Sequence, residues 1–245
     1  MPWTIHQLDQ IDSTNTYAAA YVRDAITTTG QPVDRVAFIA TSQTAGRGQY
    51  DRTFVSPPGG LYMTALIENP PQHTRQPLPL LAGIATCTAL SSIIPGERFT
   101  VRWPNDVLLG EGKVAGILCE SIAIGDRYVT LVGIGVNVNT DPKLLPFKGT
   151  SLITAGGGPP RDIRAIADAI LHQLDATLTD PHWQQQFDRY DYLHGRLVTL
   201  KHRDAIIKGE AAGVIDTGSL VVLTAHGIHH MTQGSLMQVE GQNVR

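Results

Sequence analysis

The chain has 245 residues, a formal net charge of −3 and a hydrophobic fraction of 42%. This composition is typical of a folded globular protein and excludes disordered and fibrous chains. The small net charge argues against a protein whose main task is to grip nucleic acid electrostatically. No apolar run approaches the roughly 18 residues of a transmembrane helix, and no signal peptide is visible. We therefore expect a cytoplasmic protein whose two cysteines stay unpaired.

Strands and helices alternate in the first part of the chain. The segment at 41–58 is polar and contains glycine, so we expect it to be a mobile loop until a ligand binds it. In chain order the predicted elements are an edge strand (1–9), a helix (12–26), a buried strand (36–40), the loop (41–58), a strand (61–67) and a helix (78–94).

Further along, strands are predicted at 99–103, 113–121 and 128–139, and one helix at 161–187. From Gly195 the pattern changes to short strands separated by turn signals. We place a domain boundary near His194. The sequence thus predicts an α+β domain on a mixed sheet, residues 1–194, followed by a small β-barrel, residues 195–245.

The strand at 128–139 has two unlike faces. Val132, Ile134 and Val136 lie on a core face, whereas Gly133 and Gly135 lie on the other face. Glycine weakens a strand, so two glycines at alternating positions indicate close approach by another group. That group is either a ligand or a packed helix or backbone, and the strand by itself does not distinguish them.

Two other segments carry polar side chains suited to binding. The loop around Arg47 and Arg52 offers guanidinium groups for phosphate or carboxylate oxygens, but it matches neither common glycine-rich nucleotide loop. Pro104 restricts the chain just before Asp106, and Lys113 opens a strand beside small residues. Taken alone, each is more typical of a solvated loop or hairpin than of a binding site.

In combination, these segments resemble the motifs of biotin protein ligases, in the group that lacks the N-terminal DNA-binding domain. The resemblance covers nearly the whole chain in family order, and it implies a class II synthetase-like catalytic domain followed by an SH3-like β-barrel. The matching segments are Asp12-Ser-Thr-Asn15, Gln43-Thr-Ala-Gly-Arg-Gly48, Arg52, Ser56-Pro, Trp103-Pro-Asn-Asp106, Lys113-Val-Ala-Gly-Ile117 and Gly133-Ile-Gly-Val-Asn137.

The resemblance implies a reaction in two steps. Biotin attacks ATP at the α-phosphorus, which gives biotinyl-5′-AMP and pyrophosphate, and a target lysine then attacks the mixed anhydride. ATP and Mg²⁺ are implied, as is a partner, the biotin carboxyl carrier domain of a carboxylase. No DNA or membrane partner is expected. Because ligases of this group occur as monomers and dimers, a homodimer stays open.

The resemblance also assigns roles to individual residues. Lys113 and Arg47 are the implied catalytic residues, and Asp106 and Asn137 the implied Mg²⁺ ligands. The implied biotin-binding residues are Ser13, Thr14, Asn15, Gln43, Arg47, Gly48, Gln49, Lys113, Gly116, Gly133 and Gly135. The implied ATP-binding residues are Arg47, Arg52, Trp103, Asn105, Asp106, Lys113 and Asn137.

Three positions depart from the family pattern. Gln49 stands where arginine is usual in the loop, Arg102 where lysine is common, and Phe54 where tryptophan is frequent. Two other functions are considered. A lipoate–protein ligase shares the fold and the adenylate chemistry, but the Trp-Pro-Asn-Asp and Gly-Arg-Gly motifs favour biotin. A biotin-responsive repressor needs a helix-turn-helix, which is not expected here.

Overall fold

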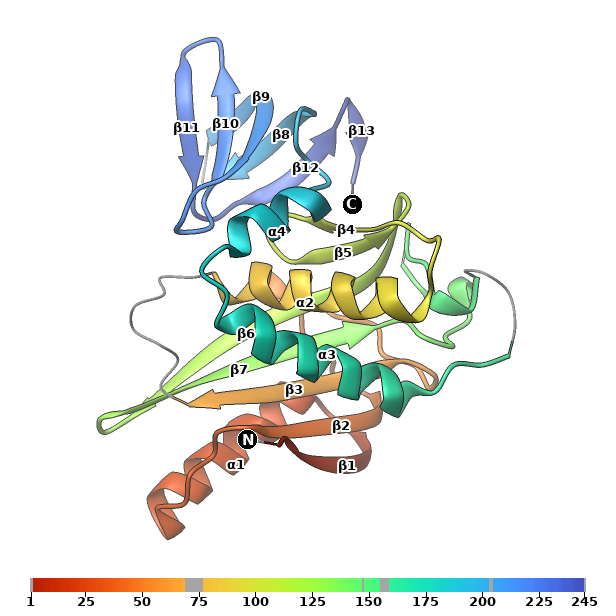
Figure 1. The fold of residues 1–245 in the computed structure, drawn as a ribbon, viewed down its shortest axis with the longest axis vertical. Coiled ribbons are helices and arrows are strands. Elements are labelled where there is room, and N and C mark those ends of the chain that lie inside the picture. The colour runs from red at the N-terminus through yellow and green to blue at the C-terminus, as the bar shows by residue number, and fades with distance from the viewer. Residues whose placement is uncertain (1, 69–76, 147, 155–158, 203–204, 245) are drawn as a thin grey trace.

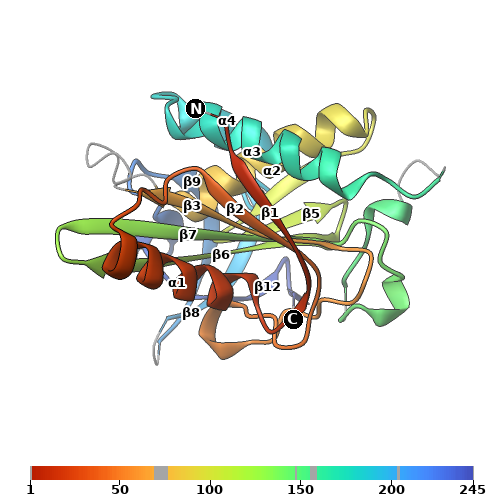
Figure 2. The same cartoon turned by 90° about the horizontal axis from the view of Figure 1, so that it is seen from below.

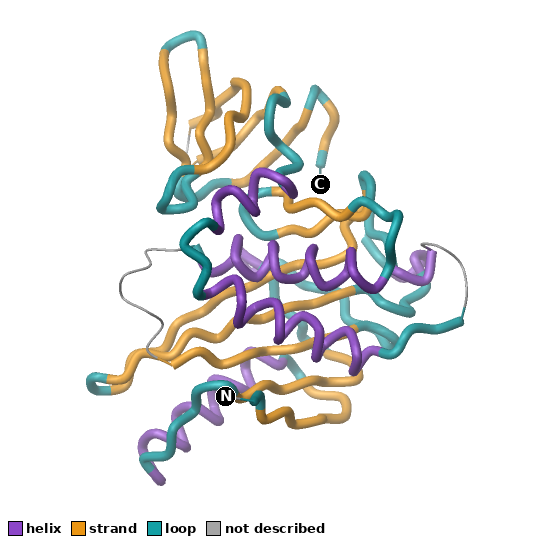
Figure 3. The backbone as a smooth tube through the Cα atoms, viewed as in Figure 1, coloured by secondary structure: helices purple, strands orange, loops and turns teal. Residues whose placement is uncertain are grey.

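The strands in the described part of the chain form two sheets, one in its first three quarters and one at its C-terminus (Figure 3). The computed structural model describes residues 2–68, 77–146, 148–154, 159–202 and 205–244. The first sheet has seven strands in the order β1-β2-β3-β7-β6-β5-β4. Their bounds are Thr4–Ile11, Val36–Gln43, Leu61–Glu68, Arg127–Val136, Gly112–Ile124, Asp106–Leu109 and Phe99–Arg102.

This sheet is mixed, as the sequence predicts. β1 pairs with β2 in parallel, whereas each of the other neighbours is antiparallel. Figure 2 shows α1 (Thr14–Asp24) on one face of the sheet and α2 (Leu78–Ile93) with α3 (Ile163–Leu178) on the other. Because both faces are covered, β3 is a nearly continuous apolar run and seven of its eight residues are buried.

The two faces of the sheet have separate cores. α1 packs against Phe38, Leu66 and Leu131, whereas α2 and α3 pack against the opposite residues of the same strands. The predicted alternation along β7 is therefore confirmed, since Val132 and Ile134 face the larger core. This arrangement holds β6 and β7 rigidly side by side, and the candidate site lies on them.

The single helix predicted at 161–187 is wrong. The structure contains two helices, α3 and α4 (Trp183–Tyr190), separated by a turn. Pro181 lies in that turn, and proline cannot donate the backbone hydrogen bond that a continuous helix requires. Short 3₁₀ turns are formed by Gln49–Asp51, Pro142–Leu144 and Leu152–Thr154, and a π turn (Ala25–Thr29) extends α1.

The C-terminal sheet has six antiparallel strands in the order β11-β10-β9-β8-β12-β13 and lies beside α4 and β4 (Figure 1). Within the described residues its edge strands do not pair with each other, so a closed SH3-like barrel is not confirmed. The boundary near His194 stays a prediction. The strand bounds are Leu197–His202, Ala205–Val214, Leu220–Thr224, Gly227–Met231, Ser235–Val239 and Gln242–Asn243 for β8 to β13.

Both cysteines are free, as predicted. Burial raises the pKa of the Cys119 thiol to about 12 and that of Cys87 further still, so neither is a reactive thiolate at neutral pH. Among the described helices, none has the length and apolar character needed to cross a membrane.

Candidate active site

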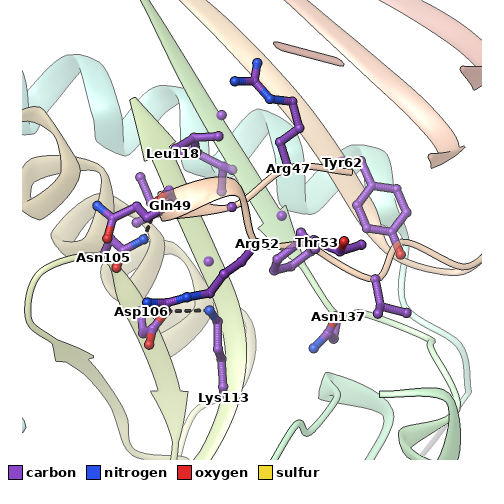
Figure 4. A pocket seen from close by; sticks show the side chains of 18 of the residues that line it. Arg47, Gln49, Arg52, Thr53, Tyr62, Asn105, Asp106, Lys113, Leu118 and Asn137 are labelled. Atoms are coloured by element: carbon purple, nitrogen blue, oxygen red, sulfur yellow. Dashed lines mark hydrogen bonds and ion pairs between the residues drawn. The ribbon is translucent and has the colours of Figure 1, made fainter. Parts of the chain in front are cut away.

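A cavity of about 370 Å³ lies over β6 and β7, under the loop that joins β2 to β3 (Figure 4). The start of α1, β5 and the segment around Leu145 complete its wall. All but one of the residues that the sequence assigns to the site line this cavity. They are Ser13, Thr14, Asn15, Gln43, Arg47, Gly48, Gln49, Arg52, Asn105, Asp106, Lys113, Gly116, Gly133, Gly135 and Asn137.

Trp103 is the exception. Its side chain is buried, and its indole Nε1 donates a hydrogen bond to the carbonyl of Gly218 at 3.0 Å. Gly218 precedes β10 of the C-terminal sheet. Trp103 therefore ties the two sheets together and does not line the cavity.

One end of the cavity is cationic. The Nζ of Lys113 lies 2.5 Å from Oδ1 of Asp106, and a guanidinium nitrogen of Arg102 lies 2.8 Å from Oδ2. Burial alone would raise the pKa of Asp106, but the charges and hydrogen bonds of Lys113 and Arg102 hold it below its ordinary value. Two cations around one carboxylate leave a net positive charge, so this end attracts anionic groups.

The opposite end presents uncharged hydrogen-bonding groups, and the charge of Arg47 at this end is paired with Glu120. Oε1 of Gln43 accepts from the backbone N–H of Thr14 at 2.8 Å, and its Nε2 donates to the hydroxyl of Ser56 at 2.8 Å. Ser13 occupies the N-cap position of α1, but its side chain makes no capping bond. Its hydroxyl is consequently not committed to the helix and lines the cavity.

Asn15 lies at the same end. Its Nδ2 donates to Glu120 at 2.8 Å, and its Oδ1 accepts from the hydroxyl of Thr64 at 2.6 Å. A Cβ atom at position 133 would stand 2.4 Å from this Oδ1. Glycine at 133 is therefore required for the Asn15 amide to lie against β7, which gives the first of the two strand glycines a physical reason.

The second glycine makes room for an aromatic ring. A Cβ atom at Gly135 would stand 2.5 Å from the ring of Phe54, and one at Gly116 would stand 2.9 Å from it. The Nζ of Lys113 lies 5.8 Å from the centre of the same ring. The space beside these two glycines, which the resemblance implies for biotin, is occupied here by the ring of Phe54, which forms a wall of the cavity.

The loop over the cavity folds as a hairpin, residues 46–54. The backbone N–H of Phe54 donates to Gly46 at 2.8 Å, and that of Gly48 donates to Arg52 at 2.7 Å. Arg52 also donates to the hydroxyl of Ser235 on β12 at 3.1 Å. Arg47 points away from the Lys113–Asp106 pair (Figure 4) and binds Glu120 with two nitrogens. The hairpin therefore crosses the cavity between β6 and the C-terminal sheet.

The predicted magnesium ligands differ in their surroundings. Oδ1 of Asn137 is buried and has no hydrogen-bond partner within the described residues, while its Nδ2 donates to Thr150. Both oxygens of Asp106 are already bonded to cations. Asn137 thus offers an oxygen of the type that Mg²⁺ binds, and Mg²⁺ usually takes its other ligands from water and substrate phosphates.

Several residues of the site escape the sequence analysis. Glu120 follows Gly116 and Leu118 at alternating positions of β6, so strand periodicity could have placed it on the cavity side. Ser235 lies on β12 of the C-terminal sheet, and Val244 follows β13. No sequence pattern predicts that Ser235 and Val244 lie near the site, because their position depends on how the two sheets pack.

Known proteins resemble this chain over most of its length. The model of the biotin/lipoate A/B protein ligase family matches residues 8–139, more than half of the chain. The chain belongs to this family. As a member, it is 32% identical over 177 residues to a biotin–[acetyl-CoA-carboxylase] ligase of Mycobacterium tuberculosis, which covers 70% of this chain and 64% of that protein.

Another sequence relative and a solved structure are also similar to this chain. It is 30% identical over 203 residues to a bifunctional ligase/repressor of Bacillus subtilis, covering 78% of this chain and 62% of the relative. A solved biotin protein ligase from Aquifex aeolicus, in complex with biotin and ATP, superposes with a TM-score of 0.77 at 28% identity and covers 95% of this chain and 97% of that one. The chain spans less than two thirds of the first two relatives it matches.

Proposed function

We propose that this protein is an ATP-dependent biotin–protein ligase, which makes biotinyl-5′-AMP and transfers biotin to a lysine of a carrier domain. The observation that carries the proposal is the polarity of the cavity. Uncharged groups of Gln43 and Asn15 lie at one end and the cation of Lys113 at the other. Lys113 lies beside Gly116 of β6, and Asn15 bonds to Glu120 of the same strand. The two ends are therefore separated by four residues of β6, which span about 13 Å at ~3.3 Å per residue.

Biotin has the matching polarity. Its ureido group is neutral and both donates and accepts hydrogen bonds, and its carboxylate lies at the other end of the molecule. The Gln43 and Asn15 amides are suited to the first and Lys113 to the second. The structures of relatives add support, since one of them was solved with biotin and ATP bound.

The same polarity favours biotin over lipoate. An apolar dithiolane ring would leave the Ser13 hydroxyl and the second acceptor site of Asn15 Oδ1 without partners, at a cost of roughly 1–3 kcal/mol for each buried group. Ser13 and Thr14 are both buried there. A fully apolar ligand tail would therefore bind poorly at this end.

The first chemical step needs stabilisation of negative charge at phosphorus. Lys113 lies between Asp106 and Phe54, so its ammonium is held in place before substrate arrives. Preorganised cations of this kind stabilise a transition state without further reorganisation. Arg102 keeps Asp106 charged, and Asp106 in turn orients Lys113. We infer that Lys113 contacts both the biotin carboxylate and the α-phosphate.

Bound Mg²⁺ would neutralise phosphate charge on the nucleotide. Asn137 would hold it through Oδ1, whereas Asp106 would contribute mainly by holding Lys113. The carrier domain of a carboxylase, the cytoplasmic location, the homodimer and the SH3-like character of residues 195–245 stay predictions that accompany this proposal.

The proposal is tested by following the product. The protein is incubated with biotin, Mg-ATP and a biotin carboxyl carrier domain, and the carrier is analysed by mass spectrometry. We expect biotin to be added to one lysine, and no addition to a carrier in which that lysine is replaced by arginine. A carrier that stays unmodified while biotinyl-AMP accumulates would confine the activity to the first step.

A further inference from the structure

Glu120 joins two parts of the site that come from distant segments of the chain. Its Oε2 accepts from Nδ2 of Asn15 at 2.8 Å and from Nη1 of Arg47 at 3.1 Å, and its Oε1 accepts from Nη2 of Arg47 at 2.8 Å. Asn15 belongs to α1, and Arg47 belongs to the hairpin over the cavity. One carboxylate on β6 therefore bonds to both the floor and the cover of the amide end.

The first consequence concerns the hairpin. Paired hydrogen bonds between a guanidinium and a carboxylate fix both groups in one plane, so they are directional as well as attractive. Elsewhere the hairpin is held by the bond from Arg52 to Ser235 and by the packing of Phe54 against Gly135. Glu120 therefore holds the Arg47 side of the hairpin over the amide end.

The second consequence concerns the amide of Asn15. Both of its N–H groups are engaged, one by Glu120 and one by the carbonyl of Leu118 at 3.3 Å. Its oxygen accepts one bond, from Thr64, and an amide oxygen can accept two. Asn15 can thus present only an acceptor to a ligand, and Glu120 is what holds it in that orientation.

We propose that Glu120 is a positioning residue, which holds Arg47 over the amide end of the cavity and fixes Asn15 as an acceptor for a ligand N–H. The inference rests on the proposed function and deepens it, because a ureido ring supplies such an N–H. Glu120 does not itself line the cavity, so it acts through its two neighbours.

Two substitutions separate the two roles. Glu120→Gln keeps an oxygen for Asn15 but loses the charge and the second acceptor for Arg47. We expect biotin to bind with a Kd within twofold of wild type, and biotinyl-AMP to dissociate about two- to fivefold faster, the range seen for partly exposed ion pairs. Glu120→Ala removes both contacts, so the Kd for biotin should also rise, by about two- to tenfold.

Binding is measured by calorimetry with biotin alone, and dissociation by stopped-flow chase of preformed biotinyl-AMP. Glu240→Gln is the matched control, since Glu240 pairs with Arg196 at 3.3 Å beside the ends of β12 and β8, outside the cavity. It should change neither quantity. Thermal unfolding of each variant reports any general loss of stability.

The outcomes are distinct. If the wild-type protein forms no biotinyl-AMP, the proposed function fails first. If the wild type forms it and Glu120→Gln releases it at the wild-type rate or more slowly, the positioning role is overturned. The role is also overturned if both variants weaken biotin binding and speed biotinyl-AMP dissociation by equal factors and both have a lower Tm. That result would show that Glu120 only stabilises the fold.

Discussion

Replacement of Lys113 by alanine tests the cationic end of the cavity. The substitution removes the ammonium that lies 2.5 Å from Asp106 and leaves that carboxylate paired with Arg102 alone. The cluster then changes from a net positive charge to neutral. Loss of one preorganised donor at a developing oxyanion costs about 2.7–4 kcal/mol, so adenylation should slow by ~10²- to 10³-fold.

Stability should change far less than activity. The side chain of Lys113 is 34% exposed, and the buried Asp106 keeps its ion pair with Arg102, so loss of the Lys113 pair should cost about 1 kcal/mol, the upper end of the range for exposed pairs. For a chain of this size, each 1 kcal/mol shifts the Tm by about 2–4 °C. We therefore expect Lys113→Ala to unfold within about 4 °C of wild type.

The assay is biotin-dependent exchange of pyrophosphate into ATP, with Lys208→Ala on β9 as a control outside the cavity. Lys113→Arg should recover only part of the rate, since guanidinium and ammonium groups place their charge and donors differently. A loss of less than tenfold for Lys113→Ala would refute the role assigned to this residue, and so would a loss matched by a collapse of the Tm.

Three further predictions follow from other parts of the site and fold. Gln49→Arg restores a cation to the hairpin and should slow the release of biotinyl-AMP in a chase experiment. An equal release rate would contradict the idea that Gln49 weakens the hold of the hairpin on this intermediate. Ser235→Ala removes the partner of Arg52 and should raise the KM for ATP severalfold with biotin affinity unchanged, as steady-state kinetics and calorimetry would show. Burial raises the pKa of Asp191 to about 6, so the native state holds this proton more tightly than the unfolded chain, and stability should fall as the pH rises from about 4 to 6. Asp191→Asn should abolish that slope in thermal unfolding.

Local patterns predict most of this fold. Alternation along β7 gives the core face and the glycine face, because side chains of a strand alternate strictly. The helix error at 161–187 has a simple cause, since apolar spacing on both sides of Pro181 resembles one continuous helix. The closed barrel is a different matter, because pairing between strand edges depends on curvature that residue patterns do not specify.

The site is predictable where residues are close in a strand or a motif. Asp106 and Lys113 meet because β5 and β6 form a hairpin with a two-residue turn at Gly110–Glu111, a connection between neighbouring segments of the chain. The role of Trp103 is not predictable in this way, since its partner Gly218 lies more than a hundred residues away. Glu120 likewise gains its importance only when α1 and the hairpin are brought beside β6.

The central claim is that the cavity binds a ligand with a neutral polar ring at one end and a carboxylate at the other. The most direct test is release of pyrophosphate from Mg-ATP, measured separately with biotin, lipoate and octanoate. We expect release with biotin and none above background with the other two acids. Release with lipoate or octanoate but not with biotin would contradict the account.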